Sequence, residues 1–155
     1  MGIWYGDEVA DDSELRLCGD IVGKRVLELG LGSNPNAVAM ATRGAKAIAL
    51  DPSPDRIARL RAAAEAAEVK VECHQGELAD LGFATSGSMD LVIASHSIDD
   101  VDDLPRLLRQ VHRVLRPGAP FVVAMRHPVA AMFYGSDSTA QRPYGADEFP
   151  QPVCK

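Results

Sequence analysis

Short strand-like runs alternate with helical patterns along most of this chain, and that order constrains the fold more than any single residue does. Four apolar runs and one alternating run are too short for helices, which predicts strands at 25–29, 46–50, 69–73, 89–95 and 119–125. Helical spacing fills the gaps after residue 34, over 54–68 and over 104–115. Because such strands join through right-handed crossovers, the sequence predicts a doubly wound α/β fold, with a mostly parallel sheet and helices on both faces.

Turn residues mark where the predicted helices begin and end. Asn34 is expected to cap the first helix and Pro35 to take its first position, where a missing N–H costs nothing. Gly44 is expected to end that helix. The helix over 54–68 is amphipathic, with Ile57, Leu60 and Ala64 on its apolar face and Arg56, Arg59 and Glu65 outside.

The composition is that of a globular domain. The 155 residues are 46% hydrophobic and 25% charged, and only 5% are aromatic, which disfavours an all-β fold. The net charge of -6 repels phosphate backbones, so we expect a small-molecule partner and no nucleic acid. No apolar run approaches the roughly 20 residues of a membrane span, and the acidic start lacks a signal peptide's pattern. We therefore expect no membrane partner and a cytoplasmic location.

The three cysteines give no sign of a disulfide framework or a metal site. Cys18, Cys73 and Cys154 form no CxxC pair, so reduced thiols and no structural metal are expected, with Cys73 in a core strand. A folded domain is expected over residues 1–126. An irregular tail is expected over 127–155, which is rich in Pro, Gly and polar residues.

A glycine-rich turn follows the first predicted strand, in the order Glu28, Leu29, Gly30, Leu31, Gly32, Ser33, Asn34. Glycine permits positive φ and leaves no Cβ between the backbone and a ligand, so a turn of this kind before a helix suits a nucleoside cofactor. The same turn could serve only to reverse the chain tightly. A dinucleotide fingerprint is disfavoured, because it requires glycine where this chain has Pro35.

Acidic residues follow the next two strands. Asp51 comes 21 positions after Gly30, where a carboxylate can accept both hydroxyls of a ribose; it could instead be a turn residue before Pro52. Glu77 could accept the exocyclic amine of an adenine or could be a solvated loop acid.

The fourth strand ends in Ser95 and His96, followed by Asp99, Asp100, Asp102 and Asp103. Those acids suit a solvated face or the positive end of the next helix. His96 and His127 both follow central strands, so either could act as a base or bind substrate, or could be an ordinary surface histidine. Trp4 and Tyr5 could form a lid over a cofactor or anchor the first segment to the core.

Five segments resemble the successive motifs of the class I S-adenosylmethionine-dependent methyltransferases, especially the small-molecule type: VLELGLGSN, ALDPSP, QGELADLGF, MDLVIASHSIDDV and RVLRPGAPFVVAM. The resemblance covers about residues 24–125. It implies a Rossmann-like sheet, S-adenosylmethionine as cofactor and S-adenosylhomocysteine as product. It places the methionine part of the cofactor at Glu28, Gly30 and Gly32, the ribose at Asp51 and Pro52, the adenine at Glu77 and Leu78, and the sulfonium at Ser95.

Two departures from that family stand out. Asn34 replaces a third glycine and puts a side chain beside the cofactor. The family's sheet usually ends in an antiparallel hairpin, which we expect to be missing, because only 126–155 remain after the fifth strand. That would leave an exposed sheet edge at which two copies could pair as a homodimer. Whether the chain is a fragment or a natural short form stays open.

The expected function is methyl transfer from S-adenosylmethionine to a small-molecule acceptor, with His96 as the first candidate base and His127 as the second. A non-catalytic module that binds S-adenosylmethionine or mediates an interaction is the main alternative. A nicotinamide-dependent dehydrogenase is disfavoured by Pro35 and by the lack of recognisable hydride-transfer residues. The identity of the acceptor cannot be read from the sequence.

Overall fold

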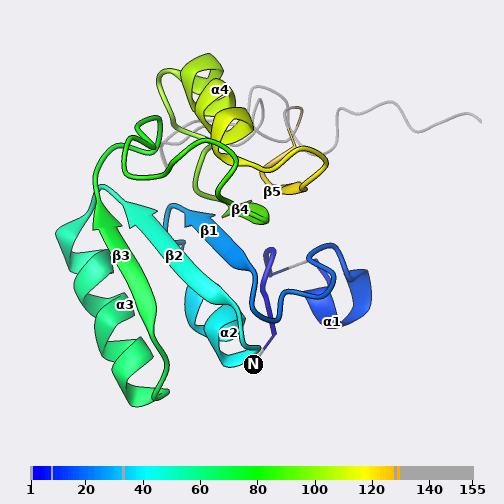
Figure 1. Cartoon of the computed structure of the whole chain (residues 1–155), viewed down its shortest axis with the longest axis vertical. Helices are drawn as coiled ribbons and strands as arrows, with labels where there is room; N and C mark the ends of the chain where they lie inside the picture. Colours follow the sequence, from blue (N-terminus) through cyan, green and yellow to red (C-terminus); the bar gives the residue numbers. More distant parts are fainter. Residues whose placement is uncertain (1, 8, 33, 128, 130–155) are drawn as a thin grey trace, which may run out of the picture. The chain divides into compact units, whose positions relative to one another are not determined.

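The computed structural model describes residues 2–7, 9–32, 34–127 and 129 (Figure 1). The chain divides into two units, Met1–Met125 and Arg126–Lys155, which are described separately. In the second unit Arg126, His127 and Val129 are described, and the Val129 N–H lies 3.2 Å from His127 Nδ1, which accepts its hydrogen bond. The rest of the predicted tail, including Cys154, lies outside the described residues.

The first unit is built on a five-stranded sheet in the order β3-β2-β1-β4-β5. The strands are β1 (Arg25–Leu29), β2 (Lys46–Asp51), β3 (Val71–Gln75), β4 (Leu91–Ser95) and β5 (Phe121–Ala124). All four neighbouring pairs are parallel, and Figure 1 shows β1, β2 and β3 pointing the same way. The predicted α/β fold is confirmed, and each predicted strand is present with its ends shifted by two residues or fewer.

Four helices accompany the sheet: α1 (Asp12–Leu15), α2 (Ala37–Thr42), α3 (Pro54–Ala66) and α4 (Leu104–Val114). Figure 1 shows α2 and α3 on one side of the sheet and α4 on the other. The buried side chains accordingly form two clusters, one with the apolar faces of α2 and α3 and one with that of α4. Leu27 and Leu29 of β1 are fully buried in the second cluster, and burial of each stabilises the fold by about 1.5–3 kcal/mol.

The predicted start of α2 is wrong. The helix begins at Ala37, with Asn36 at the capping position and no side-chain cap from it, while Asn34 is exposed in the preceding loop. The reason is that Glu28, at the end of β1, supplies the cap through its own carboxylate. A side chain from the neighbouring strand therefore replaces the local cap that the sequence indicates.

The two edge strands differ from the buried centre of the sheet. Cys73 lies in the edge strand β3 and is half-buried, so it is only partly a core residue. At the other edge β5 pairs with β4 alone among the described residues, and Val123 remains 37% exposed. No described helix is long and apolar enough to cross a membrane.

Candidate active site

Two adjoining cavities lie at the carboxyl ends of the strands and share Arg56 and Ser97. The first cavity, of about 540 Å³, is lined by Trp4, Leu31, Gly32, Pro35, Arg56, Arg59, Ala63, His96 and Ser97. The second, of about 420 Å³, is lined by Pro52, Arg56, Glu77, Leu78, Ala79, Ser97, Asp100, Val101, Asp102, Asp103 and Arg106. Each volume lies in the range of roughly 300–1,000 Å³ that is typical of small-molecule sites.

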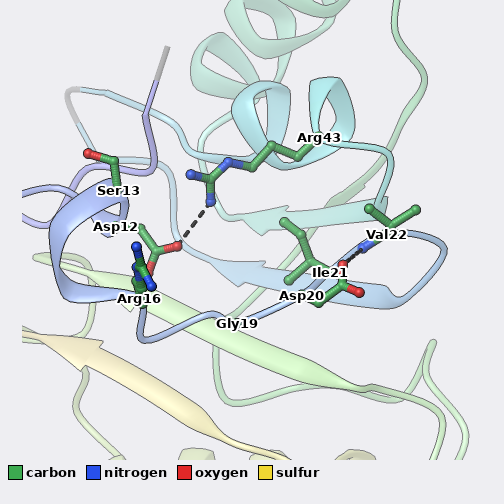
Figure 2. A pocket seen from close by; sticks show the side chains of 8 residues that line it. All are labelled: Asp12, Ser13, Arg16, Gly19, Asp20, Ile21, Val22 and Arg43. Carbon is green, nitrogen blue, oxygen red and sulfur yellow. Dashed lines mark hydrogen bonds and ion pairs between the residues drawn. The ribbon is translucent and has the colours of Figure 1, made fainter.

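A third cavity, of about 410 Å³, lies beside α1 and the segment that leads into β1. Figure 2 shows Arg43 reaching toward Asp12 across it, and their ion pair is 3.0 Å long. None of the residues that the sequence assigns to the cofactor or to catalysis lines this cavity. The candidate active site is therefore the pair of cavities at the carboxyl edge.

The glycine turn forms the floor between those two cavities. Gly30 has φ +73°, and its N–H donates to Leu50 C=O at 2.8 Å. A Cβ at position 30 would lie 2.5 Å from Ser97 Cβ, so a side chain there would collide with the loop after β4. A Cβ at Gly32 would lie 3.2 Å from the Ser95 carbonyl oxygen, and Gly32 itself lines the first cavity. The turn thus requires glycine for close packing within the protein as well as for access to the cavity.

Glu28 supports the turn from behind and does not line either cavity. Its side chain is buried, and its two oxygens accept hydrogen bonds from the N–H groups of Asn36 and Ala37, each at 2.7 Å. Burial raises the pKa of Glu28 to about 7, although these hydrogen bonds act in the opposite direction. Glu28 therefore fixes the first turn of α2 relative to β1.

Asp51 lies at the end of β2, as predicted, but it is fully buried. Its carboxylate accepts hydrogen bonds from the N–H groups of Leu31 and Ser53, each at 2.7 Å, and Arg56 Nη1 lies 3.5 Å from Oδ2. These contacts tie the glycine turn to the start of α3. A ribose would reach the carboxylate only after a neighbouring side chain or the turn had moved.

The predicted adenine residues meet in the second cavity. Pro52, Glu77 and Leu78 all line it, although they follow two different strands. Three aspartates from the loop before α4 line it as well, namely Asp100, Asp102 and Asp103. Asp103 also caps α4, because its side chain accepts a hydrogen bond from Arg106 N–H at 3.0 Å. The acids therefore serve the helix terminus and give this cavity a negative lining.

An N-terminal segment, residues 2–6, crosses the first cavity. The Trp4 N–H donates to Asn36 Oδ1 at 2.7 Å, and Asn36 Nδ2 donates back to Trp4 C=O at 2.9 Å. Ser95, predicted beside the sulfonium, is buried and donates its hydroxyl to the same carbonyl at 3.2 Å. Trp4 is half-buried and lines the cavity, as the lid interpretation expects.

Tyr5 satisfies the other interpretation, because it anchors the N-terminal segment in the core. Its hydroxyl donates to Asp12 Oδ1 at 2.8 Å and lies 3.2 Å from Cys18 Sγ. Burial is the main cause that raises the pKa of Tyr5, and burial also raises the pKa of the Cys18 thiol to about 11. Burial alone would raise the pKa of Asp12, but hydrogen bonds from Cys18 N–H, Tyr5 and Arg43 lower it. The root of the segment is therefore a neutral phenol and a neutral thiol around one carboxylate.

His96 lines the first cavity and has φ +49°, in the left-handed region that is uncommon for residues other than glycine. Its Nε2 lies 2.9 Å from Tyr5 C=O, and a carbonyl can only accept, so Nε2 carries the proton. In a neutral ring the lone pair is then on Nδ1. The Trp4 ring lies 6.1 Å from the His96 ring, centroid to centroid.

The other predicted residues are less directly placed. Asn34 is exposed and lines neither cavity. His127 belongs to the second unit, so its role stays a prediction. The sequence analysis missed three contributors: Asn36, Arg56 and Arg59. The two arginines were assigned only to the outer face of their helix, although their position just after β2 is a signal that they lie at the carboxyl edge.

A family model described as "Methyltransferase domain" matches residues 27–123, which include both sides of this groove. The chain belongs to the methyltransferase domain family. The predicted class, the class I S-adenosylmethionine-dependent methyltransferases, is confirmed by this match together with the solved structures that follow.

Among curated relatives, the ubiquinone biosynthesis O-methyltransferase of Sodalis glossinidius is 31% identical over 121 residues, which are 77% of this chain and 49% of the relative. The enzyme of the same name from Xanthomonas oryzae pv. oryzae is 28% identical over 114 residues, which are 74% of this chain and 48% of the relative. The chain therefore spans about half the length of these relatives.

Solved structures agree on the fold. An S-adenosylmethionine-dependent methyltransferase from Mesorhizobium loti matches with a TM-score of 0.65 and 30% identity, over 74% of this chain and 52% of the other. A putative S-adenosylmethionine-dependent methyltransferase from Listeria monocytogenes matches with a TM-score of 0.66 and 19% identity, over 84% of this chain and 60% of the other. At that identity the second match shows the fold alone.

The groove fits the cofactor that this family implies. Gly32 brings backbone to the wall of the first cavity, where a Cβ would close on Ser95 C=O. In the second cavity Leu78 offers an apolar surface and the exposed Glu77 carboxylate an acceptor, a combination that suits a purine ring with an exocyclic amine. The residues present are therefore compatible with S-adenosylmethionine.

Proposed function

We propose that this chain transfers a methyl group from S-adenosylmethionine to a nucleophilic atom of a small molecule. The observation that carries the proposal is the groove itself: Gly32, Pro52, Glu77 and Leu78, which the family motifs assign to the cofactor, line two adjoining cavities, and His96 lines one of them. The cavities are small, which favours a small acceptor over a macromolecule.

When bound, the cofactor supplies a methyl group that its sulfonium already makes electrophilic. The main task of the protein is then to orient the acceptor and exclude water, and good positioning can lower a barrier by about 7–11 kcal/mol. The second cavity would hold the adenosine part, with Glu77 and Leu78 against the base. The first cavity would hold the acceptor beside Trp4 and His96.

His96 is the proposed base for an acceptor that must lose a proton. Because Nε2–H is donated to Tyr5 C=O, the proton would be accepted at Nδ1. The same hydrogen bond fixes the ring through the N-terminal segment, so that segment positions the base as well as covering the cavity. His127 remains the second candidate.

A label-transfer assay tests this proposal. The full chain is incubated with methyl-labelled S-adenosylmethionine and a panel of small hydroxyl, amine and thiol compounds, and labelled product is measured. With an acceptor found, His96→Ala should lower turnover by roughly 10²–10⁴ while affinity for S-adenosylhomocysteine stays unchanged. His112→Ala, at an exposed position on α4, is the matched control.

A loss below about threefold in His96→Ala would assign that side chain to packing, and a comparable loss in His127→Ala alone would move the role to His127. Tight binding of S-adenosylhomocysteine with no transfer to any acceptor would favour the non-catalytic binding module instead.

A further inference from the structure

The two cavities of the groove differ in charge. The second cavity is lined by four acids, Glu77, Asp100, Asp102 and Asp103, together with Arg56 and Arg106. None of the described residues that line the first cavity is acidic, and two of them are arginines. On a chain of net charge -6, a local excess of positive charge at the acceptor side of the groove is unusual.

The two arginines are not equivalent. Arg56 lies 3.5 Å from the Asp51 carboxylate, so its charge is partly balanced within the protein. Arg59 has no ion-pair partner among the described residues. Arg56, Arg59 and Ala63 follow one another at helical spacing on α3, so they form a single stripe along the cavity wall. The Arg59 guanidinium is thus available to a ligand.

The opposite part of the wall is aromatic and held in place. The Trp4 backbone is bound at both its N–H and its C=O by Asn36, and Pro35 lines the same cavity. Because the main chain is fixed, the indole offers a flat apolar surface at low entropic cost. Ala63 on the arginine stripe is small, which leaves room for a ring between helix and indole.

We infer that the acceptor is a planar aromatic molecule that carries a carboxylate, with its ring against Trp4 and its carboxylate on Arg59. A guanidinium binds a carboxylate through two parallel hydrogen bonds, which fixes orientation as well as adding affinity. The inference rests on the proposed function, because it assigns the first cavity to the acceptor. It makes Arg59 the residue that determines specificity for charge.

The test compares two probes of nearly equal shape, para-hydroxybenzoate and its uncharged amide, by calorimetric titration of the full chain. Titrations are run on the free protein and on protein saturated with S-adenosylhomocysteine. The benzoate should bind about tenfold more tightly than the amide. Arg59→Gln should remove that preference, and Ala63→Met should weaken both probes by filling the space beside Arg59.

Arg61→Gln is the matched control, since it removes the same charge from the same helix at an exposed position that does not line the cavity. Equal affinity for the two probes, or an equal loss of preference in Arg61→Gln, would overturn the inference. If Arg59→Gln instead lowered the affinity for S-adenosylhomocysteine, the guanidinium would serve the cofactor and the inference would again be wrong. The proposed function fails separately, through absent binding of S-adenosylhomocysteine to the wild-type chain, and the titrations on the free protein still decide the role of Arg59.

Discussion

Replacement of Glu28 by glutamine should give a loss of stability that depends on pH. In the folded protein the carboxylate accepts two backbone N–H groups, one on each oxygen. Glutamine offers one carbonyl oxygen, so its amide nitrogen would face the second N–H. One buried donor left without an acceptor costs about 1–3 kcal/mol.

The pH dependence comes from the raised pKa of Glu28. Folding shifts that pKa from 4.5 to about 7, mainly through burial. Between those values the folded state binds more protons than the unfolded chain, so the contribution of Glu28 to stability falls as the pH rises through this window. The shift corresponds to at most about 3 kcal/mol. Glutamine does not titrate, so Glu28→Gln should be destabilising at pH 5 and much less so at pH 8.

Urea unfolding of the wild type and of Glu28→Gln at both pH values measures the difference, in which other titrating groups largely cancel. Glu65→Gln, at an exposed position on α3, is the control and should be neutral at both. An equal or larger loss in Glu28→Gln at pH 8 would refute the reasoning, because it would mean that the two hydrogen bonds keep the carboxylate ionised throughout.

Three further predictions concern the glycine turn, the end of β2 and the sheet edge. Gly30→Ala should cost about 1–2 kcal/mol for its positive φ, plus the clash with Ser97, and adding Ser97→Gly should recover the clash but not the φ term; urea unfolding of both variants checks this, and no recovery would remove Ser97 from the argument. Asp51→Ala should lose about 1.5–3 kcal/mol of affinity for S-adenosylhomocysteine by calorimetry, and unchanged affinity would remove Asp51 from the site. The unpaired side of β5, with Val123 and Met125 exposed, should make the chain dimerise or aggregate with rising concentration, whereas a strictly monomeric species in light scattering would show that the edge is covered.

The strands and the longer helices could be predicted from the sequence because their signals are local. Buried parallel strands such as β1 and β4 are short apolar runs, and α4 shows an apolar stripe at helical spacing. The glycine turn and the acids after β2 and β3 could be placed at one edge, because the carboxyl ends of parallel strands meet there.

The remaining features depend on contacts between distant residues. The cap of α2 comes from Glu28 on a neighbouring strand, so the local pattern pointed to Asn34 instead. Trp4 is bound by Asn36, 32 positions away, and by Ser95, 91 positions away. Position after β2 indicated a ligand role for Asp51, but only the fold shows that backbone amides already occupy its oxygens. Propensity and periodicity carry no information about such pairings.

The central claim is that the groove at the carboxyl edge holds S-adenosylmethionine. Calorimetric titration of the full chain with S-adenosylmethionine, S-adenosylhomocysteine and NAD tests it most directly. We predict micromolar binding of the first two, one molecule per chain, and no measurable binding of NAD. Binding of NAD in preference to S-adenosylhomocysteine would contradict the account.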